Sequence, residues 1–181
     1  MCDECFMIFT PYPTLHTERL ILRELRDTDA EALYGLRTDT RVNQYIKRAA
    51  MTSVPEAARY IEHITEGITS GMWIYWAICL QHDDHLIGTI CLWQFTPDRE
   101  QAEIGYEMYP TYQGQGVMSE AIRAVIDYGV EQLGLVRLEA YTHRDNAQSI
   151  RLLERFDFVL DEEQVDEHNK NNVIYVWRKM G

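Results

Sequence analysis

One stretch decides the fold of this chain: AEIGYEMYPTYQGQGVMSEA, residues 102–121. Its first part alternates between apolar and polar residues as a strand does, its middle carries two glycines one residue apart, and its last part begins a helical pattern. Glycine tolerates crowded and left-handed backbone, and the first turn of a helix has main-chain N–H groups without internal partners. A strand, a tight loop and a helix start therefore predict a site for an anion such as a phosphate or pyrophosphate. From the loop alone, glycines that merely turn the chain are an equally open interpretation.

The glycine pattern differs from both common phosphate-binding motifs. A Gly-x-Gly-x-x-Gly motif would need glycine at position 119, where the chain has Ser119. A P-loop would need a Lys-Ser or Lys-Thr pair after Gly116, and none follows. The pattern therefore indicates another phosphate-containing ligand.

Further segments give the motif a specific resemblance. YQGQG (112–116) followed by VMSEA (117–121), together with NAQSIRLLE (146–154), resembles the acetyl-coenzyme A signature of the GNAT superfamily of N-acetyltransferases. Within that superfamily the chain is most similar to the RimJ/RimL type, which acetylates N-terminal amines of ribosomal proteins. TERLILR (17–23) looks like the first strand of that type, so the resemblance runs from roughly residue 15 to the end.

Length and composition predict one domain. A chain of 181 residues with 46% hydrophobic and 25% charged residues is typical of a soluble globular protein. We expect an irregular arm over residues 1–14 and a single N-acetyltransferase domain over residues 15–181. No apolar run approaches a membrane span, and acidic residues follow Met1 where a signal peptide would carry basic ones. The expected location is therefore the cytoplasm, with no membrane partner.

The net charge of the chain indicates which classes of partner it can bind. A net charge of −12 argues against nucleic acid, which is bound through clustered Lys and Arg. It favours cationic partners such as protonated amines, although an acidic surface that only keeps the protein soluble explains it equally well. The four tryptophans are typical of a core, and a homodimer is left open.

The cysteines do not predict a metal site. Cys2 and Cys5 form a C-x-x-C pair, but Cys79 and Cys91 lie 12 residues apart in strand-like runs and offer no second close pair. Buried reduced thiols are the better interpretation, and no metal cofactor is expected.

Periodicity and turn signals predict an α/β fold with a mixed central sheet flanked by helices, and the resemblance implies that this sheet is mostly antiparallel. The resemblance implies in addition a GNAT-like topology whose central strands splay apart to bind acetyl-CoA. The expected strands cover residues 16–25, 73–80, 86–93, 101–108, 135–142, 158–160 and 173–177, with HDDH (82–85) as a polar hairpin loop. The expected helices begin at an N-cap Asp27, cover residues 40–46, cover residues 54–70 after a capping box that starts at Ser53, follow Gly116, and follow an N-cap Asn146.

The resemblance implies acetyl-CoA as the co-substrate and assigns its binding groups. In the family the pantetheine arm pairs with the strand before the loop, and a main-chain N–H faces the thioester oxygen; by position that donor is Met108. Asn146 is expected to turn its amide toward the pantetheine. The cofactor-binding residues are therefore expected to be Met108, Gln113, Gly114, Gln115, Gly116, Val117, Met118, Ser119, Asn146 and Ser149.

Two positions depart from the usual family pattern. Thr111 stands where Gln or Arg is usual, three residues before the first glycine of the loop. Leu153 stands where many members carry a tyrosine that acts as general acid, seven residues beyond the asparagine. For the acid we therefore look to Ser149, as the RimJ/RimL type suggests; the alternative is an ordinary helix serine that bonds a carbonyl one turn back.

The catalytic residues expected are Glu103, Ser149 and Met108. Glu103 lies on the central strand near the expected thioester, where its carboxylate can accept the ammonium proton directly or through water. A carboxylate paired with a nearby Arg is the alternative, and Glu107 on the same strand face is the second candidate for the base. An N-terminal amine, with a pKa of about 7.7–8.0, is already partly neutral near pH 7, so water alone is also left open as the base.

The function expected is therefore acetyl-CoA-dependent N-acetylation of a primary amine, above all the N-terminal α-amine of a protein or peptide. Small amines, amino acids and antibiotics stay open as acceptors. Thr111 and Leu153 motivate an alternative of another class, a non-catalytic acyl-CoA-binding module.

Overall fold

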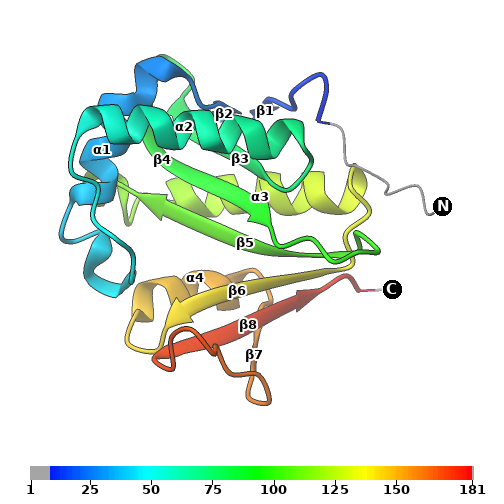
Figure 1. Cartoon of the computed structure of the whole chain (residues 1–181). Helices are drawn as coiled ribbons and strands as arrows, with labels where there is room; N and C mark the ends of the chain where they lie inside the picture. The colour runs from blue at the N-terminus through cyan, green and yellow to red at the C-terminus, as the bar shows by residue number, and fades with distance from the viewer. Residues whose placement is uncertain (1–8, 181) are drawn as a thin grey trace.

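The sheet in the computed structural model has the strand order β1-β2-β3-β4-β5-β6-β8-β7 across residues 9–180, the part of the chain that the structure describes (Figure 1). The strands are β1 (Leu15–His16), β2 (Leu20–Glu24), β3 (Ile74–Leu80), β4 (Asp83–Trp93), β5 (Gln101–Met108), β6 (Arg137–His143), β7 (Val159–Asp161) and β8 (Asn172–Arg178). Only β5 and β6 pair in parallel among these neighbours. The predicted mixed, mostly antiparallel sheet is confirmed.

Helices cover both faces of the sheet. They are α1 (Ala30–Thr38), α2 (Val54–Thr69), α3 (Val117–Glu131) and α4 (Ala147–Arg155). The helices α1 and α2 lie in front of the sheet in Figure 1, whereas α3 and α4 lie behind it. The strand β3 is apolar along its whole length because it is covered on both faces, and its Trp76 and Ile78 are fully buried. The expected α/β architecture, a mixed sheet flanked by helices, is therefore confirmed.

The capping signals place two helix starts correctly. Ser53 Oγ accepts the N–H of Glu56 at the start of α2 (3.4 Å), and Asn146 Oδ1 accepts the N–H of Ser149 at the start of α4 (3.1 Å). These bonds satisfy donors that the helix itself leaves unpaired. Both N-caps were predicted from the sequence.

Four local predictions need correction. The strand expected over residues 16–25 is divided into β1 and β2, which pair antiparallel because the chain turns between them, with Thr17 N–H donating to Leu20 O. Asp27 begins a 3₁₀ turn (Asp27–Asp29), and α1 starts only at Ala30, because the carboxylate of Asp29 accepts the N–H of Arg26 and tightens this entry. Residues 40–46 hold only a 3₁₀ turn, Asn43–Tyr45. In the HDDH segment, Asp83 already pairs with Leu80, so β4 extends through these polar residues and the turn is shorter than expected.

The strands β5 and β6 separate after a short contact. Their pairing covers only Gln101–Glu103 against Arg137–Glu139, although each strand continues beyond it. Over its remaining length β6 stays paired with β8, and β5 stays paired with β4. The sheet therefore opens into a V-shaped gap between β5 and β6.

The remaining predictions concern thiols and termini. Cys79 is buried and Cys91 partly buried; burial raises the pKa of their thiols to about 11 and about 12. Cys2, Cys5 and most of the predicted arm (residues 1–14) lie outside the described residues, so the division of the chain into arm and domain stays a prediction. Within residues 9–180, three or more His, Cys, Asp or Glu side chains nowhere gather as a metal site would require. In the same part of the chain, each helix is too short or too polar to cross a bilayer.

Candidate active site

The open edge of β5 carries main-chain donors that point into the gap. Tyr109 N–H donates to Ile87 O of β4 (3.0 Å), and Met108 stands opposite Gly88. In an antiparallel pair, residues that bond the neighbouring strand alternate with residues whose N–H and C=O point away from it. The N–H groups of Met108 and Tyr106 therefore face away from β4 toward the gap, where β6 does not pair with them.

The glycine loop lies directly beyond the end of β5. Gly114 and Gly116 have φ values of 74° and 78°, in the left-handed region that other residues adopt only at a cost in free energy. The first α-helical bond of α3 runs from Glu120 N–H to Gly116 O (3.0 Å). The N–H groups of Val117, Met118 and Ser119 thus lie in the first helical turn, where the helix supplies no acceptor.

Gln113 fastens this loop to the strand. Its main-chain N–H donates to Pro110 O (3.2 Å), and its side-chain amide donates to Met108 O (3.0 Å). The N–H group of Gln113 is therefore already hydrogen-bonded within the protein. The other predicted loop donors, from Gly114 onward, lead into the first turn of α3.

Arg19 holds the other side of the loop. Its guanidinium donates to Gln115 O (3.0 Å) and to the carboxylate of Glu120 (2.7 Å), and Thr17 also donates to that carboxylate. Partial burial alone would raise the pKa of Glu120, but these hydrogen bonds hold it below its usual value. The negative charge at the start of α3 is thus neutralised by Arg19 within the protein.

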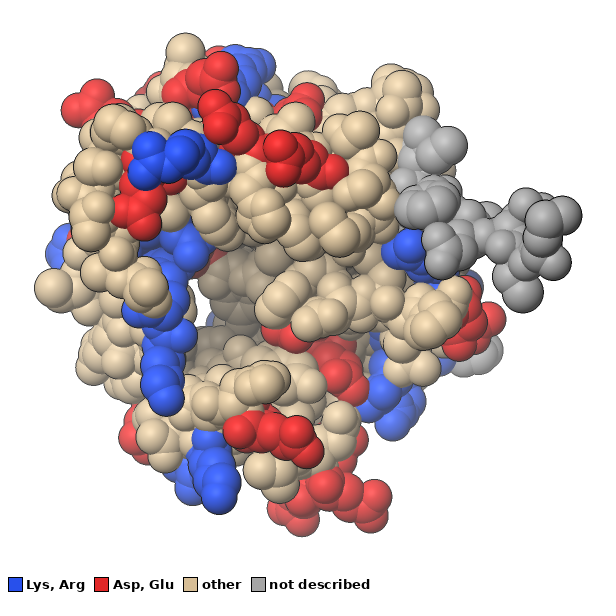
Figure 2. Space-filling model, viewed as in Figure 1, with Lys and Arg blue, Asp and Glu red and all other residues tan. Residues whose placement is uncertain are grey.

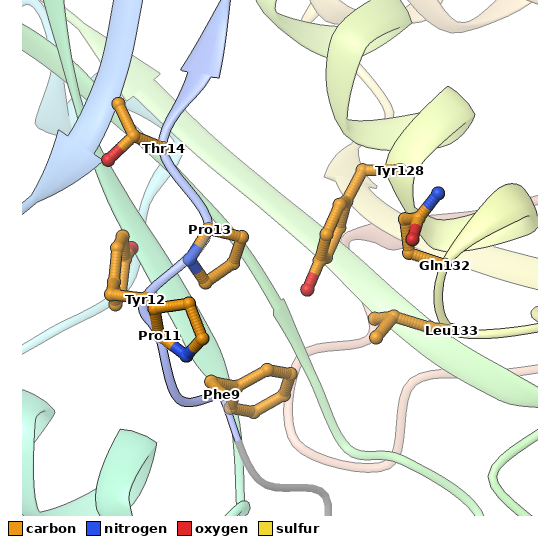
Figure 3. Close-up of a pocket in the computed structure, with 8 residues that line it drawn as sticks. All are labelled: Phe9, Pro11, Tyr12, Pro13, Thr14, Tyr128, Gln132 and Leu133. Atoms are coloured by element: carbon orange, nitrogen blue, oxygen red, sulfur yellow. The ribbon is translucent and has the colours of Figure 1, made fainter.

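A groove runs along α3 from this loop. Its lining includes Gly116, Ser119, Arg123 and Arg155, and the Arg155 guanidinium donates to Ser119 Oγ (3.3 Å). Left-handed glycines, N–H groups of a helix start and two arginines form a donor set that fits a pyrophosphate with a further phosphate nearby. A second pocket, between Phe9–Thr14 and the far end of α3, adjoins the far end of this groove, with which it shares Thr14, Tyr128 and Gln132, and does not adjoin the loop (Figure 3).

Ser149 meets a tyrosine across the gap. The hydroxyl groups of Ser149 on α4 and Tyr106 on β5 lie 2.9 Å apart, within hydrogen-bond distance. Burial raises the pKa of Tyr106 to about 12, although its bond to Ser149 opposes the shift. Ser149 is therefore held by a side chain of β5, beside the strand whose N–H groups face the gap.

Glu103 lies on the opposite face of β5. Burial raises its pKa to about 8; contact with the Trp93 indole opposes this shift, and the negative charges of Glu139 and Asp166 add to it. Glu139 stands beside it in the register of β6. A carboxyl with a pKa close to working pH has the acidity that suits a general base.

Glu107 is held by arginines. Its carboxylate lies 2.6 Å from Arg48 Nη1 and 3.7 Å from Arg37 Nη1, and it is 8% exposed. The ion pair with an arginine, which was the alternative for Glu103, is thus found at Glu107. Within residues 9–180 the carboxylate of Glu103 has no such ion pair.

Four residues near the gap were missed by the sequence analysis: Tyr106, Arg19, Arg37 and Arg48. Tyr106 could have been found, because it shares the strand face of Ile104 and Met108 by period two. The arginines could not, because each reaches the site from a distant segment.

Comparisons with known proteins identify the family of this chain. Residues 19–159 match the family model described as acetyltransferase (GNAT) domain. Over 147 residues the chain is 36% identical to the uncharacterized N-acetyltransferase YoaA of Bacillus subtilis, which covers 81% of this chain and 83% of YoaA. Over 79 residues, 44% of each protein, it is 35% identical to the ribosomal-protein-serine acetyltransferase of Escherichia coli.

A solved structure shows the same fold. RimL, a ribosomal L7/L12 α-N-protein acetyltransferase in complex with coenzyme A, has a TM-score of 0.79 and 20% identity, over 92% of this chain and 98% of that one. The fold and the family match together define an acyl-transferring enzyme. The chain belongs to the GNAT family of acetyltransferases and is an N-acetyltransferase.

Proposed function

We propose that this enzyme transfers the acetyl group of acetyl-CoA to the N-terminal α-amine of a protein or peptide, as the RimJ/RimL type does. The observation that carries the proposal is the gap between β5 and β6, whose free main-chain edge leads directly into the glycine loop. A space-filling view shows an opening through the molecule between the half that carries α1, α2 and β5 and the half that carries β6 and β8 (Figure 2). RimL, whose solved structure has the same fold, is in complex with coenzyme A.

The binding groups follow from that geometry. The N–H groups from Gly114 to Ser119 would hold the pyrophosphate, and Arg19 would keep the loop in place through its hydrogen bond to Gln115 O. The side-chain oxygen of Asn146 is used by its helix cap, which leaves its amide nitrogen to donate to the pantetheine. When bound, acetyl-CoA supplies an activated thioester.

Met108 would stabilise charge during transfer. Its N–H faces the gap and would donate to the thioester oxygen as negative charge develops there. One such positioned donor lowers the activation barrier by about 2.7–4 kcal/mol.

The proposed mechanism uses one proton-transfer group on each face of β5. Ser149, hydrogen-bonded to Tyr106, would give a proton to the departing thiolate on the α4 side. Glu103, on the other face, would accept the proton of the amine. Its pKa of about 8 matches the 7.7–8.0 of an α-amine far better than the roughly 10.4 of lysine, which supports an N-terminal acceptor.

The experiment offers acetyl-CoA with three acceptors: a lysine-free peptide with a free N-terminus, the same peptide N-blocked and carrying one lysine, and a panel of small amines. Release of free thiol measures turnover, and mass spectrometry places the acetyl group. We expect rapid acetylation of the free N-terminus only. Acetylation confined to lysine or to small amines would overturn the proposal, and acetyl-CoA binding without thiol release would favour a module that lacks chemistry.

A further inference from the structure

Two arginines share one carboxylate at the end of β5. Arg37 on α1 and Arg48, in the segment between α1 and α2, both reach Glu107. Thr89 Oγ1 lies 3.5 Å from the same carboxylate, and Tyr75 in turn lies 3.2 Å from Thr89. The cluster therefore carries one net positive charge, because a single carboxylate faces two guanidinium groups.

The arginine pair, Arg37 and Arg48, has guanidinium N–H donors without acceptors. Arg48 uses Nη1 for Glu107, but its Nε and Nη2 and the Nε of Arg37 are buried and have no hydrogen-bond partner within residues 9–180. Burying such donors without an acceptor costs free energy. The side chains of Arg37 and Arg48 nevertheless keep 14% and 16% of their surface exposed, so a small ligand can contact part of each side chain.

The arginine pair lies beside the proposed transfer site and on its acceptor side. Glu107 precedes Met108, so its side chain leaves β5 on the face opposite Tyr106 and Ser149 and on the same face as Glu103. Arg37 is held there by stacking on Tyr60 of α2, 4.2 Å from the ring centre. In Figure 2, Lys and Arg side chains follow the border of the opening on the side of α1 and the segment after it.

We infer that the arginine pair binds a carboxylate of the acceptor, so that the enzyme acetylates amines that carry a carboxylate a few bonds away. Arginine presents a planar pair of donors that matches a carboxylate, and Glu107 keeps both guanidinium groups oriented without neutralising both. This inference rests on the proposed function, since it names the class of acceptor. An acidic residue at the N-terminus of a peptide and the α-carboxylate of a free amino acid both supply this chemistry.

The test compares acceptors that differ only in the carboxylate. The peptide amides Glu-Ala-Ala-Ala-NH₂ and Gln-Ala-Ala-Ala-NH₂ form one pair, and alanine with alaninamide forms the other. We expect kcat/KM to favour the carboxylate member of at least one pair about tenfold or more, as for a charge-assisted hydrogen bond. The Arg48→Gln variant should lose this preference while still acetylating the Gln peptide, and Arg48→Lys should restore part of it.

The control and the outcomes separate this inference from the proposed function. Arg59→Gln, on the exposed side of α2, removes a positive charge away from Glu107 and should keep the preference. Equal rates within both pairs, or an Arg48→Gln variant that lowers both members equally, would overturn the inference and leave the proposed function standing. Preference for alanine over alaninamide without peptide acetylation would overturn the proposed function and support the inference.

A binding measurement tests the inference even if the enzyme acetylates neither peptide. Calorimetry with the N-acetylated Glu and Gln peptides, in the presence of coenzyme A, should show at least tenfold tighter binding of the Glu peptide to the parent and not to Arg48→Gln. Equal affinity of the two peptides for the parent would contradict the inference without reference to any rate.

Discussion

The hydroxyl group of Tyr106 lies 2.9 Å from that of Ser149, so a side chain of β5 meets a side chain of α4 at the gap. Leu153, where many GNAT enzymes carry a tyrosine, is 1% exposed and belongs to the core. A phenol is nevertheless present beside Ser149, because β5 supplies it from the facing strand. In the proposed mechanism Tyr106 would orient the Ser149 hydroxyl and would replace the proton that Ser149 gives up.

Tyr106→Phe and Ser149→Ala should each lower kcat by about tenfold to a hundredfold and leave the KM for acetyl-CoA nearly unchanged. Both hydroxyls are proposed to act on the departing thiolate, which exists only as the bond to sulfur breaks. Because they act as one unit, the double variant should be little worse than either single variant. Steady-state kinetics with a free-thiol readout measures all three.

A tyrosine on another element serves as the control for these variants. Tyr34→Phe, on α1, should keep the parent kcat. If the double variant lost the product of the two single effects, Tyr106 and Ser149 would act independently, and the positioning role of Tyr106 would be wrong.

The pH dependence should follow Glu103. Its carboxylate form accepts the proton and its pKa is about 8, so activity should rise with pH up to about 8 and level off above it. Glu103→Gln should lower kcat/KM about tenfold to a hundredfold. The α-amine of the acceptor titrates in the same range, so the rise alone does not identify the group.

Removal of a neighbouring charge separates these two groups. The carboxylate of Glu139 helps to raise the pKa of Glu103, so Glu139→Gln should move the midpoint of the profile to lower pH. The same change leaves the amine of the acceptor untouched. Glu131→Gln, at the exposed end of α3, should leave the midpoint in place; an unmoved midpoint in Glu139→Gln would assign the titration to the acceptor.

The sequence predicts the local parts of this enzyme well and the distant contacts poorly. The bounds of β5, the loop with Gly114 and Gly116, and the cap at Asn146 depend on residues close in the chain, and the structure contains each of them. The helix expected over 40–46 failed because its residues turn around Asn43, whose side chain donates to Arg37 O and Asp39 O.

The candidate site, too, could be predicted from the sequence only where it depends on residues close in the chain. The roles of Glu103, Met108 and Ser149 stay predictions. The structure brings Met108 and Ser149 to the gap, whereas Glu103 lies in the paired part of β5, opposite Glu139 and five residues before Met108. The arginines around Glu107 could not be foreseen, because Arg48 is 59 residues away from it in the chain and no local pattern links them. Contacts of this kind depend on how the segment between α1 and α2 packs on the sheet.

Gly116→Val should raise the KM for acetyl-CoA about tenfold or more. At φ of 78° a branched side chain strains the backbone, and its Cβ would stand 3.4 Å from Arg19, which fixes the loop. Gly134→Val is a matched control, since Gly134 also has a positive φ but lies in open space beyond α3. If both variants fold and bind acetyl-CoA like the parent, the proposed pyrophosphate site is misplaced.

The stability of the face that carries α1 should depend on a buried ion pair. Arg23 lies 2.7 Å from Asp29, whose side chain is 6% exposed, and 2.7 Å from Asp84, whose side chain is 64% exposed. Removing the buried partner leaves a guanidinium group poorly compensated in the interior, so Asp29→Ala should cost about 3–5 kcal/mol of unfolding free energy. Asp84→Ala removes an exposed partner and leaves Asp29 in place, so it should cost less, about 1–3 kcal/mol for the Arg23 Nε that loses its acceptor.

Urea denaturation of the two variants measures this difference, and an unchanged slope shows that the folded state is intact. Asp29 also accepts the main-chain N–H of Arg26 (2.8 Å), so part of its effect could come from the lost cap. Asp29→Asn keeps an oxygen for that bond, whereas it removes the charge and replaces the other oxygen, which accepts from Arg23 Nη2, with an NH₂ group. If Asp29→Asn were as stable as the parent, the cap and not the ion pair would hold the entry to α1; we expect most of the loss to remain.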